Sequence, residues 1–223
     1  MDASIADTDA PVLDLTTRQI WERLSADTRD ALLQNHWDVN VDDTFWYESV
    51  ISDFKERMKE IGIEVEQVYY SGFSSQGDGA CFEGYVQDWD KFVVAAGLPN
   101  LAKLPSEVPD LRWKHSGHYY HEYCMSFDGS NLHAENPYDE DDNPLRYHAW
   151  IVNYGEGGPY YKHEEAFIEF VRGQARDLYR RLEEEYDDLT SEEAITEYLL
   201  DCKESEELLD LIDDVEPDNP FVG

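Results

Sequence analysis

The fold is decided at residues 69–84, which read YYSGFSSQGDGACFEG. Apolar side chains on both sides of the centre follow the period of a half-buried strand: Val65, Val68, Tyr70, Ala80 and Phe82. The centre is small and polar, and its glycines at 77 and 79 permit a tight turn. The sequence therefore predicts a β-hairpin over residues 63–86, whose tip carries Ser75, Gln76 and Asp78.

Two further strands are expected after the hairpin. Residues 111–127 alternate between two faces, and residues 147–154 return with Trp150 and Val152 on one face. Residues 128–144 between them are polar and acidic, which predicts a loop. Together with the hairpin, these segments predict an antiparallel sheet of about four strands.

Helical segments lie on both sides of the expected sheet. Apolar residues three and four apart predict helices over 16–34, 45–61 and 89–96, and a long helix over 164–189. Asp27 is expected to cap a second short turn, Thr44 to cap the second helix, and Gly62 to end it. Residues 190–193 match a capping box, and the leucines after 207 mark a short third C-terminal helix.

The order of these elements predicts an α+β fold with N-terminal helices, an antiparallel sheet and an acidic helical C-terminal region. We expect a flexible acidic leader over 1–14, an α+β core over 15–163, and a helical region over 164–216 packed on that core. The spacing of repeated βαβ units is missing from the sequence, which argues against a Rossmann fold.

The charge of the chain restricts the class of partner. There are 51 acidic and 17 basic residues, for a net charge of −34. Such a field repels nucleic acid, so direct nucleic-acid binding is not expected. The high negative charge then has two possible explanations. The protein imitates nucleic acid on a basic protein partner, or its surface is adapted to high salt. The scarcity of lysine, with seven against ten arginines, suits the second explanation.

The setting expected for the chain is the cytoplasm. Its N-terminus has no apolar signal segment, and no run of 18 apolar residues could cross a membrane. The three cysteines, at 81, 124 and 202, are widely spaced and odd in number, which favours free thiols in a reducing compartment. Neither a cofactor nor a membrane partner is expected.

The most acidic segment is residues 183–218, which hold 17 acidic residues and one base, Lys203. If these 36 residues were one helix, they would span about 54 Å at the standard rise. That gives about one negative charge per 3 Å, close to the spacing along one DNA strand. Mimicry of nucleic acid is therefore physically feasible if the side chains line one ribbon.

Histidines cluster at residues 114–124, which read KHSGHYYHEYC. On one continuous strand His115 and His121 would lie about 20 Å apart, and His118 and His121 would face opposite sides. A zinc site using His118 and His121 would need a turn here, with a further ligand from Cys124, His133 or Asp78. A cysteine nucleophile paired with these histidines is the other catalytic possibility, although cysteines in apolar strands are usually core residues.

Several short blocks of the chain carry a resemblance to known proteins: WY at 46–47, YSGFSSQGDGACFEG at 70–84, GHYYH at 117–121, LYR at 178–180, Leu182-Glu183, Tyr186, LTS at 189–191 and Ile195. Together they resemble a family of phage and prophage proteins often labelled antitoxins of a toxin–antitoxin stability system. The resemblance implies an accessory protein of a mobile element that works by binding. It supplies no catalytic residues.

Three functions follow from these observations as hypotheses. The first is a phage or mobile-element protein that binds and inhibits a basic, nucleic-acid-handling host defence protein by imitating DNA. The second is an antitoxin that caps a toxin active site through the 69–84 hairpin, and the third is a small metal-dependent hydrolase. The residues expected to contact a partner are Ser75, Gln76, Asp78, Glu183, Glu184, Glu185, Asp187, Asp188, Glu192, Glu193, Glu197, Asp213 and Asp214.

Overall fold

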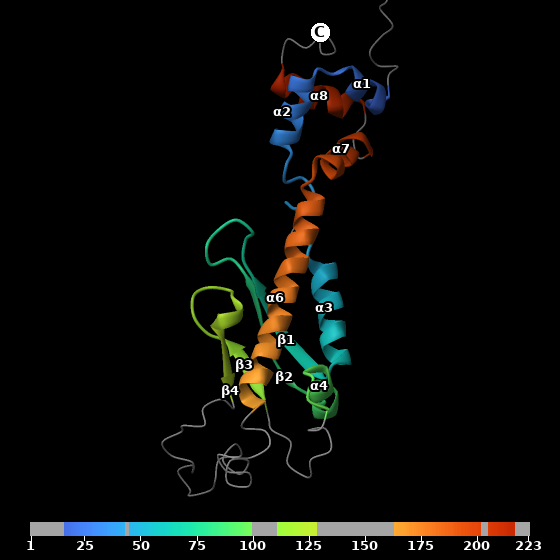
Figure 1. Cartoon of the computed structure of the whole chain (residues 1–223). Helices are drawn as coiled ribbons and strands as arrows, with labels where there is room; N and C mark the ends of the chain where they lie inside the picture. The colour runs from blue at the N-terminus through green and yellow to red at the C-terminus, as the bar shows by residue number, and fades with distance from the viewer. Residues whose placement is uncertain (1–15, 43–44, 100–110, 129–162, 202–204, 217–223) are drawn as a thin grey trace, which may run out of the picture. The chain divides into compact units, whose positions relative to one another are not determined.

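The computed structural model describes residues 16–42, 45–99, 111–128, 163–201 and 205–216 (Figure 1). The chain divides into two compact units. Unit 2 is continuous and spans Tyr47–Glu183, whereas unit 1 combines Met1–Trp46 with Glu184–Gly223. The boundary differs from the one expected at residues 163/164, because the first and last helices of the chain form a unit of their own.

Unit 2 contains a four-stranded antiparallel sheet in the order β1-β2-β3-β4. Its strands are β1 (Ile63–Tyr70), β2 (Ala80–Val86), β3 (Arg112–His115) and β4 (Met125–Asp128). The hairpin is confirmed, with Tyr70 opposite Ala80 and Val68 opposite Phe82. The α+β class and the number of strands are confirmed as well.

The expectation of one strand over residues 111–127 was wrong. The segment forms β3, turns at Gly117 with φ +112°, and passes through a short 3-10 helix (Glu122–Cys124) into β4. The amide of Ser116 donates to the carbonyl of Cys124 at 2.7 Å, which closes this second hairpin. The other expected strand, 147–154, and the loop at 129–144 lie outside the described residues.

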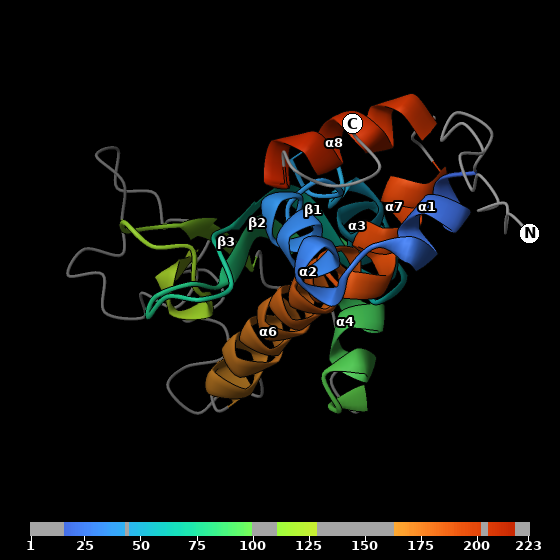
Figure 2. The same ribbon diagram turned by 90° about the horizontal axis from the view of Figure 1, so that it is seen from above.

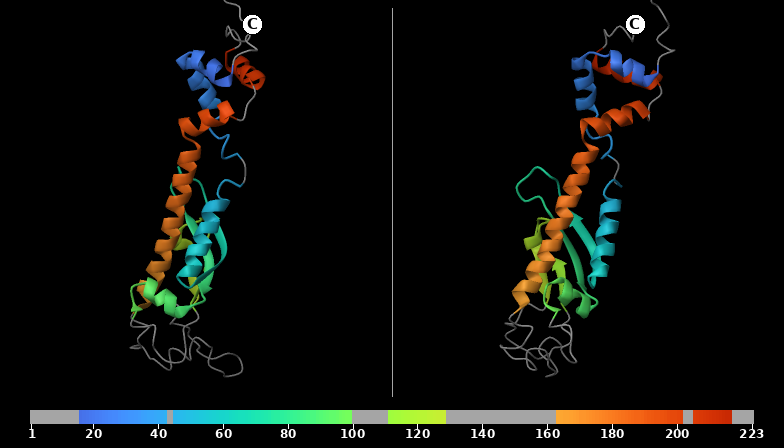
Figure 3. Two further views of the ribbon diagram at one scale, coloured as in Figure 1. Left: turned by 90° about the vertical axis from the view of Figure 1, so that its right-hand side faces the viewer. Right: turned by 45° about the vertical axis from the view of Figure 1, so that its right-hand side comes forward.

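The α-helices described in unit 2 are α3 (Glu48–Glu60), α4 (Trp89–Ala95) and the part of α6 (Glu164–Leu189) up to Glu183. Figures 1 and 3 show α3 and α6 side by side along the sheet, and Arg57 of α3 pairs with Asp177 of α6 at 3.0 Å. Aromatic side chains from three elements meet in the core: Phe54 and Phe82 at 5.2 Å, and Phe82 and Trp113 at 5.5 Å between ring centroids.

The ends of α3 were predicted in part. Gly62 follows the helix with φ +85°, as expected for a glycine stop. The residue at the N-cap is Tyr47, which makes no side-chain capping bond, and Thr44 lies outside the described residues. α4 begins after Asp88, whose carboxylate accepts from the Lys91 amide at 3.2 Å.

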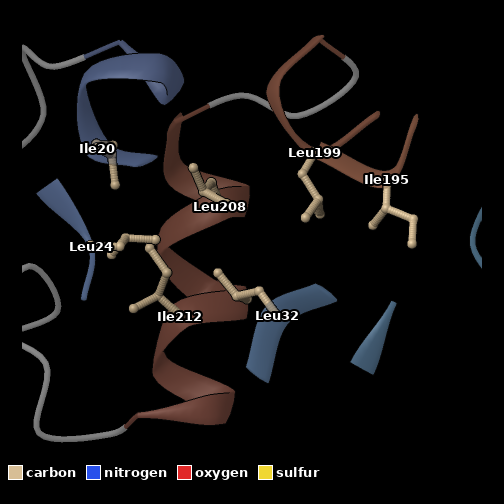
Figure 4. Packing of buried hydrophobic residues seen from close by; sticks show 7 residues of the cluster. All are labelled: Ile20, Leu24, Leu32, Ile195, Leu199, Leu208 and Ile212. Carbon is tan, nitrogen blue, oxygen red and sulfur yellow. The ribbon is translucent and has the colours of Figure 1, made fainter. Parts of the chain in front are cut away.

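Unit 1 is a small helical bundle. Figures 1 and 2 show α1 (Thr17–Arg23), α2 (Ala26–Asn35), α7 (Glu192–Asp201) and α8 (Ser205–Val215) gathered together. Figure 4 shows the core they share: Ile20, Leu24, Leu32, Ile195, Leu199, Leu208 and Ile212. The hydroxyl of Thr17 also donates to the carbonyl of Leu200 at 3.0 Å, which links α1 to α7.

Two capping residues in unit 1 differ from those expected. Residues 16–34 contain two full helices, and the cap of the second is Ser25, whose hydroxyl accepts from the Thr28 amide at 3.0 Å; Asp27 lies in the first turn. At α7 the hydroxyl of Ser191 accepts from the Ala194 amide at 3.2 Å. Thr190 instead donates to the Tyr186 carbonyl at 2.8 Å, so the predicted helix start was one residue early.

Candidate partner-binding surfaces

The hairpin tip is held by the side chain of Asp78. One carboxylate oxygen accepts from the backbone amides of Ser74 at 3.0 Å and Ser75 at 2.6 Å, and Gly77 adopts φ +107°. This carboxylate therefore stabilises its own turn, as aspartate often does in loops. Gln76 and Ser75 remain exposed, so they are the members of the predicted tip site that a partner can reach.

The tip is braced by two other parts of unit 2. A Cβ built on Gly77 would lie 3.4 Å from the Tyr119 ring, and one built on Gly79 only 2.7 Å from the Tyr120 carbonyl oxygen. The hydroxyl of Tyr179 on α6 donates to the carbonyl of Gly72 at 3.0 Å. The structure thus brings together the tip and the histidine-rich loop, which the sequence analysis connected only through Asp78 as a possible ligand of a zinc site.

An aromatic stack supports this loop. The ring of Tyr120 stacks on Tyr69 at 5.4 Å, and His115 contacts both rings at 5.2 and 5.0 Å. Tyr119 is 60% exposed beside the tip. We call the exposed residues Ser75, Gln76, His118, Tyr119 and Tyr120 the tip surface.

His118 and His121 lie in the connection between β3 and β4, and only His115 lies in a strand, so the three histidines do not share one continuous strand as predicted. His118 packs edge-on against Tyr119, and His121 lies against Tyr123 with its Nδ1 3.1 Å from a Glu122 oxygen. Within the described ranges, no group of three or more His, Cys, Asp or Glu side chains is arranged to hold a metal ion. His133, named as a possible further ligand, lies outside those ranges.

The chemistry of Cys81 opposes a role as a nucleophile. Burial raises its pKa to about 12, outweighing the lowering effect of a hydrogen bond from the His121 backbone. A thiol with such a pKa stays protonated at neutral pH, and the thiolate is the reactive form. Cys81 is fully buried in β2, as expected of a core residue.

The predicted acidic residues fall on three helices. Glu183 belongs to unit 2, while Glu184, Glu185, Asp187 and Asp188 lie at the end of α6 in unit 1. Glu192, Glu193 and Glu197 lie on α7, and Asp213 and Asp214 on α8. All of these side chains are exposed except Glu183 and Glu185, which are half-buried.

The acidic segment is not one continuous rod. It is helical, but α6, α7 and α8 are separate helices, and the last two bury Ile195, Leu199, Leu208 and Ile212 in the core of unit 1. The 54 Å line of charge considered from the sequence is therefore replaced by carboxylates spread over a bundle. We call the exposed carboxylates of Asp187, Asp188, Glu192, Glu193, Glu197, Asp213 and Asp214 the acidic surface.

Charge is divided unequally between the two units. Unit 1 holds 26 of the 51 acidic residues and 4 of the 17 basic residues, although it has the shorter share of the chain. Negative charge is therefore concentrated in the sequence segments that make up unit 1, and these segments include the acidic surface.

Comparison with known proteins places the chain in a family without a known activity. A family model described as "Domain of unknown function (DUF8835)" matches residues 46–192. The chain belongs to this DUF8835 family. The match covers all of unit 2, including the hairpin, and ends at the first residue of α7, so α1, α2 and α8 lie outside it. No curated protein and no solved structure matches the chain.

Among the helices that the structure describes, none combines the length and the apolar character needed to cross a bilayer.

Proposed function

We propose that this DUF8835 protein is an accessory protein of a phage or mobile element that binds and inhibits a basic, nucleic-acid-handling host defence protein in the cytoplasm. The observation that carries the proposal is the charge of unit 1, whose two segments of the sequence hold 26 acidic and 4 basic residues. The resemblance of the hairpin block to phage and prophage proteins supports the same setting.

Electrostatics supports inhibition by occupancy. Exposed carboxylates on a folded bundle attract a basic surface without an ordering cost for the binding segment, and they speed its association at low salt. A protein that normally contacts phosphates presents lysines and arginines, which pair equally well with carboxylates. The acidic surface would then compete with nucleic acid for the same basic groups.

The hairpin-led antitoxin is a second candidate because the tip surface is rigid and aromatic. Tyrosines are enriched among residues that dominate the energy of protein interfaces, and Tyr119 is 60% exposed on a braced loop. In that case Gln76 and Tyr119 would carry the binding energy, and binding would depend little on salt.

A metal-dependent hydrolase has the least support. Within the described part of the chain the histidines contact aromatic rings and backbone groups, and no set of three metal-ligating side chains converges.

The decisive experiment is competition between this protein and DNA for a captured partner. A tagged protein is first used to capture host proteins at about 50 mM salt, and these are released at about 0.5 M. Each basic protein released is then mixed with a fluorescent duplex, and displacement of the duplex by the wild-type protein is measured by anisotropy. We expect displacement, which would be lost in the variant Asp187→Asn, Asp188→Asn, Asp213→Asn, Asp214→Asn.

Two outcomes would contradict the first proposal. Unchanged displacement by the four-site variant would remove the acidic surface from the interface. Loss of binding in Gln76→Ala, Tyr119→Ala with retention in the four-site variant would favour the hairpin-led antitoxin.

A further inference from the structure

A groove runs across unit 1 between two walls of helix. One wall is formed by α1 and α2 and the other by α7, and the cavity has a volume of about 740 Å³. All of its lining residues belong to unit 1. The groove lies over the bundle core, since Trp21 and Leu33 in its lining also pack partly against that core.

Each wall presents one face of a helix. On α7 the lining residues are Glu193, Thr196, Glu197, Leu200 and Asp201, with Glu192 beside them. On α2 they are Ala26, Arg29, Asp30 and Leu33, and on α1 they are Arg18 and Trp21. Spacings of three, four and seven residues place side chains on the same side of a helix, so two stripes face each other across the groove.

The groove has an apolar floor with a charged rim. Trp21, Leu33 and Leu200 are only half-buried, which leaves apolar surface open between the walls. The α7 rim carries four exposed carboxylates, and the α1–α2 rim carries two arginines and one aspartate. The net charge of the lining is therefore negative, with all the positive charge on one side.

These charged groups are not paired with one another. Among the described residues, neither Arg18 nor Arg29 has a carboxylate within ion-pair distance. On α7, three acidic residues follow one another at a spacing of four: Glu193, Glu197 and Asp201. Each such pair of like charges destabilises a helix by about 0.2–0.5 kcal/mol. Cations placed along this rim would offset that repulsion.

We propose that the groove is the docking site for an amphipathic basic helix of the partner, an inference that rests on the proposed function. Apolar side chains at helical spacing enter between the walls, and lysines or arginines beside that stripe face the carboxylates of α7. Recognition of a helix by an apolar groove with a charged rim is a common mode of peptide binding. Arg18 and Arg29 on the α1–α2 wall repel a helix with basic residues on both flanks. The basic flank of the bound helix must therefore face α7, which fixes the direction of its chain in the groove.

The test uses a synthetic probe in place of the unidentified partner. The probe is a fluorescent helical peptide with leucines at i, i+3, i+7 and i+10 and lysines along one flank. Its control is a scrambled peptide of the same composition, which keeps the charge and loses the apolar face. With the full-length protein we expect the amphipathic probe to bind at least about tenfold more tightly than the scrambled peptide.

A matched pair of variants locates the site. Glu197→Gln, Asp201→Asn removes two carboxylates from the α7 rim, whereas Glu56→Gln, Glu60→Gln removes two exposed carboxylates near the end of α3, in unit 2 and outside the groove lining. Both pairs lie toward the C-terminal end of a helix, so their effects on helix stability are similar. We expect the first to weaken probe binding about tenfold and the second less than about threefold.

The apolar floor is tested by Leu200→Gln, with the far-ultraviolet circular dichroism spectrum and the melting temperature as checks on folding. Equal binding of the two peptides, or equal effects of the two charge variants, would overturn the groove proposal. These outcomes are separate from the duplex-displacement test. Displacement that survives Glu197→Gln, Asp201→Asn would refute the groove and leave the proposed function standing, and probe binding without any duplex displacement would refute only the proposed function.

Discussion

At the hairpin tip the Asp78 carboxylate accepts from two backbone amides, those of Ser74 and Ser75. Asp78→Ala leaves both amides to water, and we expect the free energy of unfolding to fall by about 1 kcal/mol, the usual value for such bonds at a surface. Asp78→Asn keeps one acceptor oxygen and should cost about half as much. Urea unfolding measures both. The control Gln76→Ala should cost almost nothing, since Gln76 is exposed.

If Asp78→Ala proved neutral, the carboxylate would not be holding the tip and would again be a candidate for direct contact with a partner. The predicted tip residues therefore separate into one structural residue and two exposed ones. The sequence could not distinguish them, because an aspartate between glycines suits both a turn and a recognition tip.

Among the described carboxylates, Asp177 is the one whose pKa is clearly shifted from its ordinary value. Burial raises its pKa, but hydrogen bonds from Arg180, Arg181 and Arg57 outweigh this and lower it from 3.8 to about 2. A lowered pKa in the folded state means that the charged form adds stability above pH 4, and that this stability is lost as pH falls from about 4 to 2.

Asp177→Asn is expected to lower the free energy of unfolding at pH 7 by about 1 kcal/mol, allowing for solvent screening of a partly exposed group. The difference between wild type and variant should shrink toward zero as pH approaches 2. Urea unfolding at several pH values measures it. Glu169→Gln, which removes an exposed partner of Arg176, is the control and should show a smaller, flatter difference. A difference for Asp177→Asn that does not depend on pH would contradict the assignment.

Among the elements, the first hairpin was predictable and the second was not. In residues 63–86 the apolar alternation predicts two strands and the glycine-rich centre predicts a tight turn between them, so both signals indicate the same β-hairpin. In residues 111–127 the alternation continues across the reversal at Gly117, because aromatic residues in the loop resemble strand residues. The Tyr119 ring lies beside Gly77 and the Tyr120 carbonyl lies close to Gly79, and local periodicity does not record such contacts between distant residues.

The start of α7 gives a test at the scale of one element. Ser191 accepts from the Ala194 amide, whereas Thr190 donates to the carbonyl of Tyr186. Ser191→Ala should therefore lower the free energy of unfolding by about 1 kcal/mol, the usual cost of a lost N-cap. Thr190→Ala should cost less than about half of that, because water replaces its single donated bond. Thermal unfolding followed by circular dichroism measures both, and a larger loss in Thr190→Ala would restore the cap predicted from the sequence.

For the whole molecule, the sequence defined the net charge but not its location. The acidic residues at 22–42 and those after 183 are far apart in the chain, and they join one unit because α1 and α2 share a core with α7 and α8. Periodicity identifies the apolar faces of these helices, but it does not say which faces meet. The groove was missed for the same reason, since the whole of unit 2 lies between its two walls in the sequence.

Unequal charge predicts an unequal response to salt. Self-repulsion destabilises a compact state of high net charge, and salt screens this repulsion over a distance that shrinks from about 20 Å to 3 Å between 0.02 and 1 M. Unit 1 carries 26 acidic against 4 basic residues, and unit 2 carries 25 against 13. Added salt should therefore stabilise α1, α2, α7 and α8 more than the sheet of unit 2.

Hydrogen-exchange mass spectrometry measures this because it reports each helix and strand separately. In sodium chloride raised from about 0.02 to 1 M, amides of α7 and α8 should exchange at least about tenfold more slowly, and those of β1 and β2 should change less than about threefold. Potassium chloride is the control for a specific ion, since screening depends on ionic strength alone. Equal slowing of exchange in both units would mean that the charge of unit 1 does not destabilise its helices more than the charge of unit 2 destabilises the sheet. Neutralising this charge would then not contribute to the binding of a basic partner.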